Sequence, residues 1–242
     1  MRVRLRLLTA VLTAGIAVGG ISACGLTRKN FQDDATLSQK ITSVRLDSGS
    51  GGVTLRGSES ATAVGLHRYV EYGGDRPEGA TYRVENGVLV LRGCDDDCTV
   101  AYTVDLPAGI PVTGKTSSGA VSLSRTGAVS VTTGSGAIDL DGVTGAVEAV
   151  ASSGAITGHG LKGGPISART SSGAVDLSAS SPQDVRVEAS SGAVTVTMPD
   201  GRYRVAAKSD SGGKEVAFSD DPSGTYRLDL TTGSGAITVK RS

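Results

Sequence analysis

The chain has 242 residues, and its 24 Lys and Arg residues are balanced by 24 Asp and Glu residues. A neutral chain lacks the basic face that nucleic-acid binding needs, so we expect no nucleic-acid partner. Glycine is abundant, at 35 residues, whereas aromatic residues make up only 3% and Trp is absent. This composition disfavours a large globular α/β core and favours a fold built from small and β-branched side chains.

The first 23 residues have the three-part pattern of an export signal. Three arginines within the first six residues precede a short apolar run over residues 7–18, and small residues then lead to Cys24. The apolar run is shorter than the ~20 residues that a membrane-spanning helix needs. Removal of residues 1–23 leaves 21 basic against 24 acidic residues, so charge alone does not draw the mature chain to anionic lipid.

The four residues at the end of this segment, Ile21, Ser22, Ala23 and Cys24, resemble the lipobox of bacterial lipoproteins. The resemblance implies cleavage after Ala23, lipidation of the Cys24 thiol, and anchoring at the extracytoplasmic face of the cell membrane. Two or more acyl chains hold a protein stably on a membrane. The alternative is an ordinary secreted protein with a cysteine at this place by chance.

The other two cysteines, Cys94 and Cys98, form a second candidate site. Export brings them to an oxidising compartment, so we expect a disulfide between them. A zinc site is the alternative, but two thiols with no His nearby supply too few ligands. We interpret the three aspartates of the intervening loop, 95–97, as a solvated tip, with calcium binding as the alternative. We therefore expect no metal and no cofactor.

Short motifs recur along the chain at a nearly fixed spacing. SSGAV stands at 117–121, 171–175 and 190–194, SSGAI at 152–156, and GSGAI at 134–138 and 233–237. A second series of short strand-like segments, half a period out of phase, begins at Val129, Val147, Ile166 and Val185. A period of about 18–19 residues with two strands in each rung predicts an all-β fold, a β-solenoid whose rungs turn at Ser-Gly corners.

Alternation of apolar and polar residues predicts which side chains face the core. One inward ladder consists of Val129, Val131, Val147, Ala149, Ile166, Ala168, Val185, Val187, Leu228 and Leu230. The other consists of Val121, Leu123, Ile138, Leu140, Ile156, Val175, Leu177, Val194, Val196, Ile237 and Val239. The residues between them are polar, so that Ile156, for example, is expected in the core and Thr157 in solvent.

We divide the mature chain into the lipidated cysteine with a polar tether at 24–40 and a single solenoid domain at 41–242. A first strand or a short helix is the alternative for the tether segment. Regular repeats are expected over 113–242, whereas 41–112 is less regular and hairpin-rich. Residues 41–57 resemble a degenerate first rung. We expect another degenerate rung, 209–216, to lie between those centred on Gly192 and Gly235.

Two hairpins are expected in the irregular part. Residues 81–93 contain an Asn-Gly step between alternating strands, which is a strong hairpin signal. Residues 88–107 are expected to form a second hairpin, closed at its tip by the two cysteines.

The sequence offers little catalytic chemistry. Its two histidines are His67, in a strand-like segment, and His159, in a Gly-rich corner. Asp139 and Asp176 fall in one outward ladder with Thr157 between them, about 10 Å apart, which is marginal for an inverting glycosidase. No third acid adjoins them, and the chain has no Trp to stack on a sugar. Arg169 and Glu188 fall at equivalent positions of neighbouring rungs, where we expect a surface pair. We therefore expect no catalytic residues and no enzyme, with a carbohydrate-active β-helix as the least favoured alternative.

The SSGAV and GSGAI repeats behind a lipobox resemble the putative adhesin family of bacterial β-repeat envelope proteins, a domain of unknown function. The resemblance covers roughly residues 41–242 and is best over 112–240. It implies a β-solenoid in a cell-envelope setting and offers no catalytic residues. We expect an adhesin-like interaction domain, anchored by its lipid, with a protein or a cell-surface polysaccharide as partner. An envelope stress or accessory lipoprotein acting with a membrane partner is the alternative.

Overall fold

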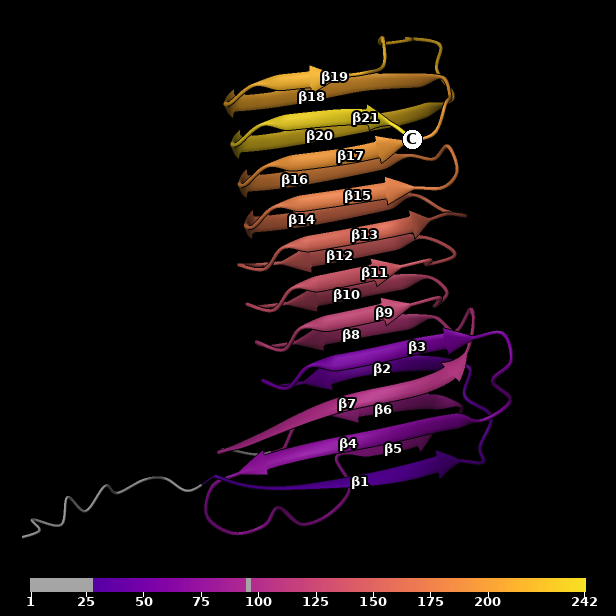
Figure 1. The fold of residues 1–242 in the computed structure, drawn as a ribbon, viewed down its shortest axis with the longest axis vertical. Coiled ribbons are helices and arrows are strands. Elements are labelled where there is room, and N and C mark those ends of the chain that lie inside the picture. The colour runs from indigo at the N-terminus through magenta and orange to yellow at the C-terminus, as the bar shows by residue number, and fades with distance from the viewer. Residues whose placement is uncertain (1–27, 95–96) are drawn as a thin grey trace, which may run out of the picture.

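A computed structural model describes residues 28–94 and 97–242 of the chain. Over these residues the chain forms 21 strands and no helix, arranged in two long sheets that face each other across one core (Figure 1). In spatial order, the 11-stranded sheet A contains β1 (Lys29–Leu37), β4 (Val64–Tyr72), β7 (Cys98–Pro107), β3 (Val53–Ser58), β9 (Val121–Ser124), β11 (Ile138–Asp141), β13 (Ile156–Leu161), β15 (Val175–Ala179), β17 (Val194–Met198), β21 (Ile237–Arg241) and β19 (Lys214–Val216).

The 10-stranded sheet B contains β18 (Tyr203–Ser211), β20 (Tyr226–Ser234), β16 (Val185–Ser191), β14 (Ile166–Ser172), β12 (Val147–Ala151), β10 (Val129–Thr133), β8 (Val112–Thr116), β2 (Ser43–Ser48), β6 (Val88–Arg92) and β5 (Tyr82–Glu85). Each regular rung contributes one strand to sheet B and the next to sheet A (Figure 1). The all-β solenoid of two-strand rungs is therefore confirmed.

The register of the regular rungs is the one that the repeats predict. Val129 of β10 lies beside Val147 of β12, which lies beside Ile166 of β14, in a parallel ladder. In sheet A, Ile156 lies between Ile138 and Val175 in the same way. The first rung, formed by β2 and β3, joins β8 and β9 in parallel, so residues 41–57 do form a degenerate rung.

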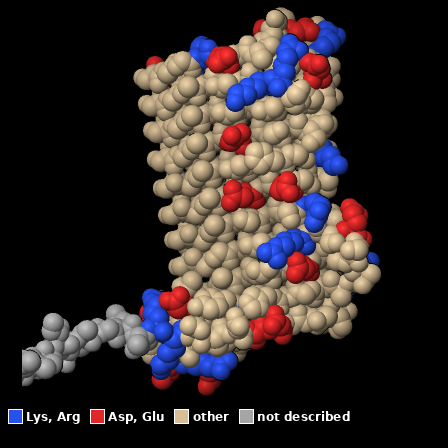
Figure 2. Space-filling model, in the orientation of Figure 1, with Lys and Arg blue, Asp and Glu red and all other residues tan. Residues whose placement is uncertain are grey.

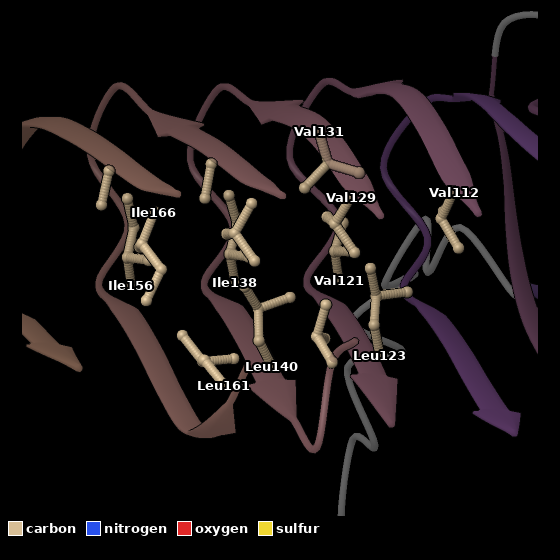
Figure 3. Packing of buried hydrophobic residues seen from close by; sticks show 14 of the residues in the cluster. Val112, Val121, Leu123, Val129, Val131, Ile138, Leu140, Ile156, Leu161 and Ile166 are labelled. Carbon is tan, nitrogen blue, oxygen red and sulfur yellow. The ribbon is translucent and has the colours of Figure 1, made fainter. Parts of the chain in front are cut away.

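The core is a thin layer of aliphatic side chains between the two sheets (Figure 3). Every residue of the two predicted inward ladders is buried, and Ile156 has no exposed surface at all. Thr157, its neighbour, is half-buried on the outer face. A strand that slipped by one residue would exchange these two faces, so burial of one face fixes the register.

The Ser-Gly corners stack so tightly that only glycine fits at their centre. A Cβ placed on Gly154 would lie 1.8 Å from the carbonyl oxygen of Gly136, and one on Gly136 would lie 2.1 Å from that of Gly119. The same contact recurs along the column, which contains Gly119, Gly136, Gly154, Gly173, Gly192, Gly235 and Gly212. The repeated glycine is therefore a packing requirement of rung-on-rung contact.

Hydroxyl groups inside the corners satisfy the backbone of this glycine column. Thr116 Oγ1 donates to the carbonyl of Gly119 at 2.9 Å, and Thr170 Oγ1 donates to that of Gly154 at 3.0 Å. Both threonines are buried. Since an unpaired buried carbonyl is costly, these hydroxyls stabilise the turn from sheet B to sheet A.

At the C-terminal end the rungs are out of sequence order, which corrects one expectation. The rung formed by β18 and β19 does not lie between its sequence neighbours; β20 and β21 pair with β16 and β17, and β18 and β19 stack outside them. The reason is hydrophobicity. Leu228 and Leu230 of β20 are fully buried and need a neighbour on both sides, whereas β18 carries half-exposed Val205 and Ala207 at those positions.

At the N-terminal end the expected tether over 24–40 is wrong for most of its length. Residues 29–37 form β1, which pairs antiparallel with β4 as the outermost strand of sheet A. The strand alternates despite its polarity, because every second residue is half-buried on the core side, namely Phe31, Asp33, Ala35 and Leu37, and the residues between them are exposed.

The first expected hairpin is confirmed and the second is wrong. β5 and β6 pair antiparallel through a turn in which Asn86 and Gly87 both have positive φ, at 50° and 80°. β6 and β7, however, lie in different sheets: β6 pairs with β2, and β7 pairs with β3 and β4. The apolar run Val88–Leu91 does not alternate cleanly, so its period did not reveal that the chain crosses from one sheet to the other after it.

Candidate interaction surfaces

The predicted lipidation site lies outside the described residues. This applies to Ile21, Ser22, Ala23 and Cys24 and to the rest of the signal segment. Within residues 28–94 and 97–242, no helix has the length and apolarity that crossing a membrane requires. Lipid anchoring therefore remains an expectation of the sequence.

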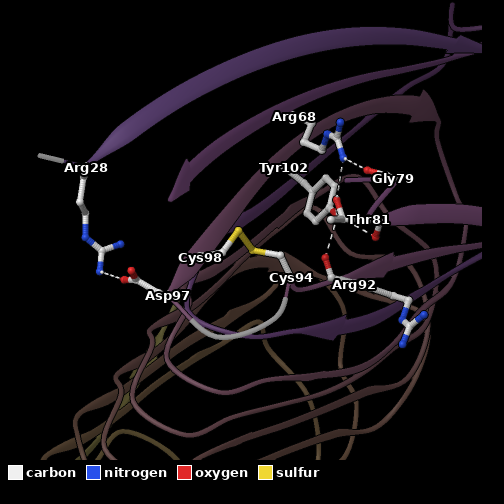
Figure 4. The surroundings of a disulfide bond; sticks show 9 residues. All are labelled: Arg28, Arg68, Gly79, Thr81, Arg92, Cys94, Asp97, Cys98 and Tyr102. Carbon is white, nitrogen blue, oxygen red and sulfur yellow. Dashed lines mark hydrogen bonds and ion pairs between the residues drawn. A yellow bond between two sulfur atoms is a disulfide. The ribbon is translucent and has the colours of Figure 1, made fainter. Parts of the chain in front are cut away.

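Cys94 and Cys98 are joined by a disulfide, with their Cα atoms 5.7 Å apart (Figure 4). The bond links the segment after β6 in sheet B to the first residue of β7 in sheet A. It therefore fastens a crossover between sheets, not the tip of a hairpin. Of the loop aspartates, Asp97 is described and forms an ion pair with Arg28 at 3.4 Å.

A polar network that the sequence did not reveal closes the N-terminal end of the core. Arg68 occupies an inward position of β4 and is only 8% exposed. Its guanidinium contacts both carboxylate oxygens of Asp33 on β1, at 3.1 Å and 2.5 Å, and donates to Thr81 Oγ1 at 3.2 Å. The hydrogen bond and charge of Asp33 raise the pKa of Arg68, so its charge is held firmly. A charged residue at an inward position of an alternating strand was the available signal.

Tyr102 of β7 joins the same network from the neighbouring strand (Figure 4). Its hydroxyl lies 2.8 Å from the carbonyl oxygen of Thr81 and 2.7 Å from that of Arg92. Burial raises the pKa of Tyr102 to about 12, because the phenolate would be desolvated there. The network is structural, because it satisfies the hydrogen-bonding groups of buried side chains and backbone at the N-terminal end of the solenoid.

On the outer face of sheet A, Ser124, Asp141 and His159 do not have the order of a catalytic triad. Ser124, Asp141 and His159 lie side by side on three consecutive strands, in that order. A triad requires the histidine between the serine and the acid, whereas here the serine and the histidine are two strands apart, or about 10 Å. Together with Arg56, these side chains line a shallow depression of about 380 Å³.

The two aspartates considered for sugar cleavage also stand apart. Asp139 and Asp176 both lie beside Thr157 in register, one on each side, and both are exposed. Two strand spacings separate their backbones by about 10 Å, at the upper limit of the range for the carboxyls of inverting glycosidases. No group of three or more His, Cys, Asp or Glu side chains among the described residues could hold a metal ion. Figure 2 shows this face: charged side chains are sparse, and the side with the stacked Ser-Gly corners is almost free of charge.

The outer face of sheet B carries a ladder of ion pairs. The predicted pair of Arg169 and Glu188 is present, at 2.8 Å, and Arg186 contacts the other oxygen of Glu188. The hydrogen bonds from Arg186 and Arg169 lower the pKa of Glu188. Arg186 also lies 3.7 Å from Asp229 on β20.

Beyond this ladder, two arginines lie side by side, and neither forms an ion pair with another described residue. Arg204 of β18 and Arg227 of β20 are nearest neighbours in register, and both are exposed. They line a depression of about 410 Å³ with Arg186, Asp184 and Asp229. The sequence did not single them out, because β18 was expected elsewhere in the stack.

The free edge of sheet B at the C-terminal end is covered by polar groups of the chain itself. Asp220 accepts a hydrogen bond from the backbone N–H of Val205 at 2.8 Å, and Lys214 Nζ donates to the carbonyl of Ala207 at 3.3 Å. Nearby, Arg202 and Ser223 lower the pKa of Asp221 to about 2 by hydrogen bonding to its carboxylate. An edge blocked in this way does not template a further strand.

The fold and these surfaces define a non-helical, two-sheet β-solenoid with a capped end. Residues 108–240 match the family described as Toastrack DUF4097, and the chain belongs to that family. The match confirms the resemblance to the β-repeat envelope family, and it covers the regular rungs. A comparison with curated proteins finds no match.

Three solved structures are similar to the chain over 88% of its length. A "putative cell adhesion protein" from Clostridium sporogenes has 14% identity and a TM-score of 0.37, and all of that chain is covered. A "putative adhesin" from Bacteroides fragilis has 12% identity, a TM-score of 0.40 and 97% coverage. Another from Parabacteroides merdae has 10% identity, a TM-score of 0.42 and 96% coverage.

Proposed function

We propose that the protein is a lipid-anchored lipoprotein on the extracytoplasmic face of the cell membrane, and that its solenoid is a non-catalytic, adhesin-like interaction module. The observation that carries the proposal is the pair of long sheet faces, along which the charged groups are spread as lateral ion pairs, as single residues and as the neighbouring arginines Arg204 and Arg227. Catalysis needs acids, bases or nucleophiles that converge on one reacting atom. Long flat faces suit an extended partner, either a protein or a surface polysaccharide.

The position of β1 supports anchoring close to the membrane. Four residues separate Cys24 from Lys29, the first residue of β1. Such a segment spans at most about 14 Å. With Cys24 lipidated, the N-terminal layer of the solenoid lies next to the lipid, and the capped C-terminal end is the part farthest from it.

The anchor is tested by labelled palmitate in the producing cells, with Cys24→Ser as the variant. We expect label on the wild-type chain and none on the variant, which is then recovered away from the membrane fraction. Equal labelling of both chains would overturn the anchoring part of the proposal.

The interaction is tested by displaying the full chain on a non-adherent host and measuring binding to isolated envelope fragments. We expect binding with the wild type, and loss of binding after either protease or periodate treatment of the fragments identifies a protein or a polysaccharide partner. A reducing-sugar assay on the same fragments serves as the control for catalysis. Sustained release of reducing ends would overturn the non-catalytic assignment, and absence of binding would overturn the interaction module.

A further inference from the structure

We propose that a groove on the outer face of sheet B binds a carboxylate-bearing polysaccharide, with Arg204 and Arg227 as the residues that hold the carboxylate. The inference rests on the proposed interaction module and names the ligand class and the site. Within residues 28–94 and 97–242, these two are the arginines that pair in register with each other.

Arg204 and Arg227 lie directly opposite each other on adjacent parallel strands, whose spacing is ~4.8 Å. Like charges at directly opposite positions destabilise a sheet. Among the described residues neither guanidinium forms an ion pair or a side-chain hydrogen bond, whereas Arg169, Arg186 and Arg202 all do. The two guanidinium groups are therefore free to face one anion together, and a carboxylate matches their fork geometry.

The groove around these arginines also offers acceptors. Arg186, Asp184 and Asp229 line it with them, over an apolar step formed by Pro165. Three arginines and two aspartates leave a net charge of +1, which suits a ligand that carries one acid group among several hydroxyls. One oxygen of Asp184 accepts from the backbone N–H of Arg227, and one oxygen of Asp229 pairs with Arg186, so the other oxygen of each carboxylate is left to accept from a ligand hydroxyl. Both carboxylates would repel a densely charged polyanion.

The groove continues along the solenoid axis. A second depression of about 350 Å³ shares Pro165 and Ser167 with the first and extends past Ala146 and Ala128 to Pro111. From Pro111 to Arg204 the equivalent positions span six strand spacings, or about 29 Å. A groove of this length, apolar along one half and cationic at its end, fits a polymer rather than a small molecule.

The placement of the groove disfavours a peptide strand as occupant. It lies on the face of the sheet, where the backbone groups are already used by the parallel ladders on both sides. An added strand needs a free edge, and the edge at β18 is covered by Asp220 and Lys214. The ligand must therefore be held by side chains, which the hydroxyls and carboxylates of an acidic sugar chain allow.

The test measures the affinity of the full chain, purified in detergent, for polygalacturonate. Arg204→Gln/Arg227→Gln is the site variant. Lys115→Gln/Lys240→Gln is the matched control, since it removes the same charge from exposed positions elsewhere on the two sheets. We expect at least a tenfold loss of affinity for the site variant and less than a twofold loss for the control. Poly(glycerol phosphate), polyglutamate and neutral dextran are the comparison ligands, and each should bind more weakly.

The inference is overturned if the wild type does not bind polygalacturonate, if a comparison ligand binds at least as tightly, or if both double variants lose affinity equally. The last result would show a general charge effect. The envelope-binding assay separates this failure from that of the proposed function. Wild-type chains that bind envelope fragments, with no loss in the site variant, leave the interaction module standing and remove only this site.

Discussion

The regular middle of the solenoid and its two ends are built by different means. Between β8 and β17, each rung lies beside the next rung of the sequence, and small aliphatic side chains fill the core. At both ends the chain leaves sequence order. All eight aromatic residues lie there, and residues 103–202 contain none. Tyr203 packs edge-on against Phe218 at one end, with ring centroids 4.9 Å apart, and Arg68 and Tyr102 form their polar network at the other.

The difference follows from what covers each layer. A middle rung is covered on both sides by copies of itself, so a repeated pattern of small side chains specifies it. A terminal rung has no such neighbour, and its apolar and polar groups need individual partners: large rings, ion pairs and hydrogen-bonded caps. Capping layers are therefore irregular in sequence because their surroundings are irregular.

The largest loss of stability is expected from a charge placed in the core of the middle rungs. Ile156→Asp places a carboxylate at a position with no exposed surface, between Ile138 and Val175. An unpaired buried charge should cost about 4 kcal/mol or more of a total of roughly 5–15 kcal/mol. The midpoint of urea unfolding measures this loss of stability. Ile156→Val is the control, and we expect it to lose only about 1 kcal/mol. Similar midpoints for the two variants would contradict the assigned register.

The second-largest loss of stability is expected from a methyl group added to the glycine column. In Gly154→Ala the new Cβ meets the carbonyl oxygen of Gly136, so the two rungs must move apart. We expect this to lower the free energy of unfolding by about 3 kcal/mol. Gly65→Ala, in the end region, meets no atom within 4 Å and should change the free energy of unfolding by less than ~0.5 kcal/mol. Equal losses would show that the column is not a packing constraint.

The buried tyrosine makes the N-terminal end sensitive to alkali. The pKa of Tyr102 is raised to about 12 from an ordinary value of 10. Its contribution is complete below pH 10 and is lost as the pH rises towards 12, because only the unfolded chain releases the proton; the loss is about 2 kcal/mol. Denaturant titrations across this range should give a shallower fall for Tyr102→Phe. Parallel pH profiles would contradict the assignment.

Removal of the disulfide should loosen one end and leave the middle intact. Cys94→Ser/Cys98→Ser opens a very short loop, which by chain entropy costs about 2 kcal/mol. Hydrogen exchange should quicken in β6 and β7, which the bond connects, and stay unchanged in β11, β13 and β15. Uniform quickening along the stack would show that the ends and the middle unfold as one unit.

The smallest loss of stability is expected from a charge added to the outer face of sheet A in the middle rungs. Thr157→Asp would put three aspartates in a row, since Thr157 lies between Asp139 and Asp176. Like charges in register should cost about 0.5–1 kcal/mol at low salt and less at high salt. Thr157→Asn is the uncharged control, with a loss of under ~0.5 kcal/mol. A loss that salt does not reduce would assign the effect to packing instead.

Sequence reasoning succeeded where the pattern is local and periodic. Alternation and repeat spacing predicted the two ladders, their register and the pair of Arg169 and Glu188. It failed where the position of a strand depends on residues far away in the sequence. The placement of β18 outside β20 depends on a comparison of two apolar patterns, and β1 forms because Phe31 and Asp33 find Tyr72 and Arg68 on β4. The arginine pair on sheet B became visible only once that stacking order was known.

The inverted order of the last two rungs has a consequence for how the molecule is completed. Each rung from β8 and β9 to β16 and β17 can dock on the rung before it as soon as its own segment of the chain is free to fold. β18 and β19 come next in the chain, but the strands that they pair with, β20 and β21, follow after them. An early attachment of β18 to β16 would be a kinetic trap that has to reopen before the last rung can enter. Residues 226–241 therefore complete this part of the stack by insertion between two rungs that precede them in the chain, not by addition to its outer side.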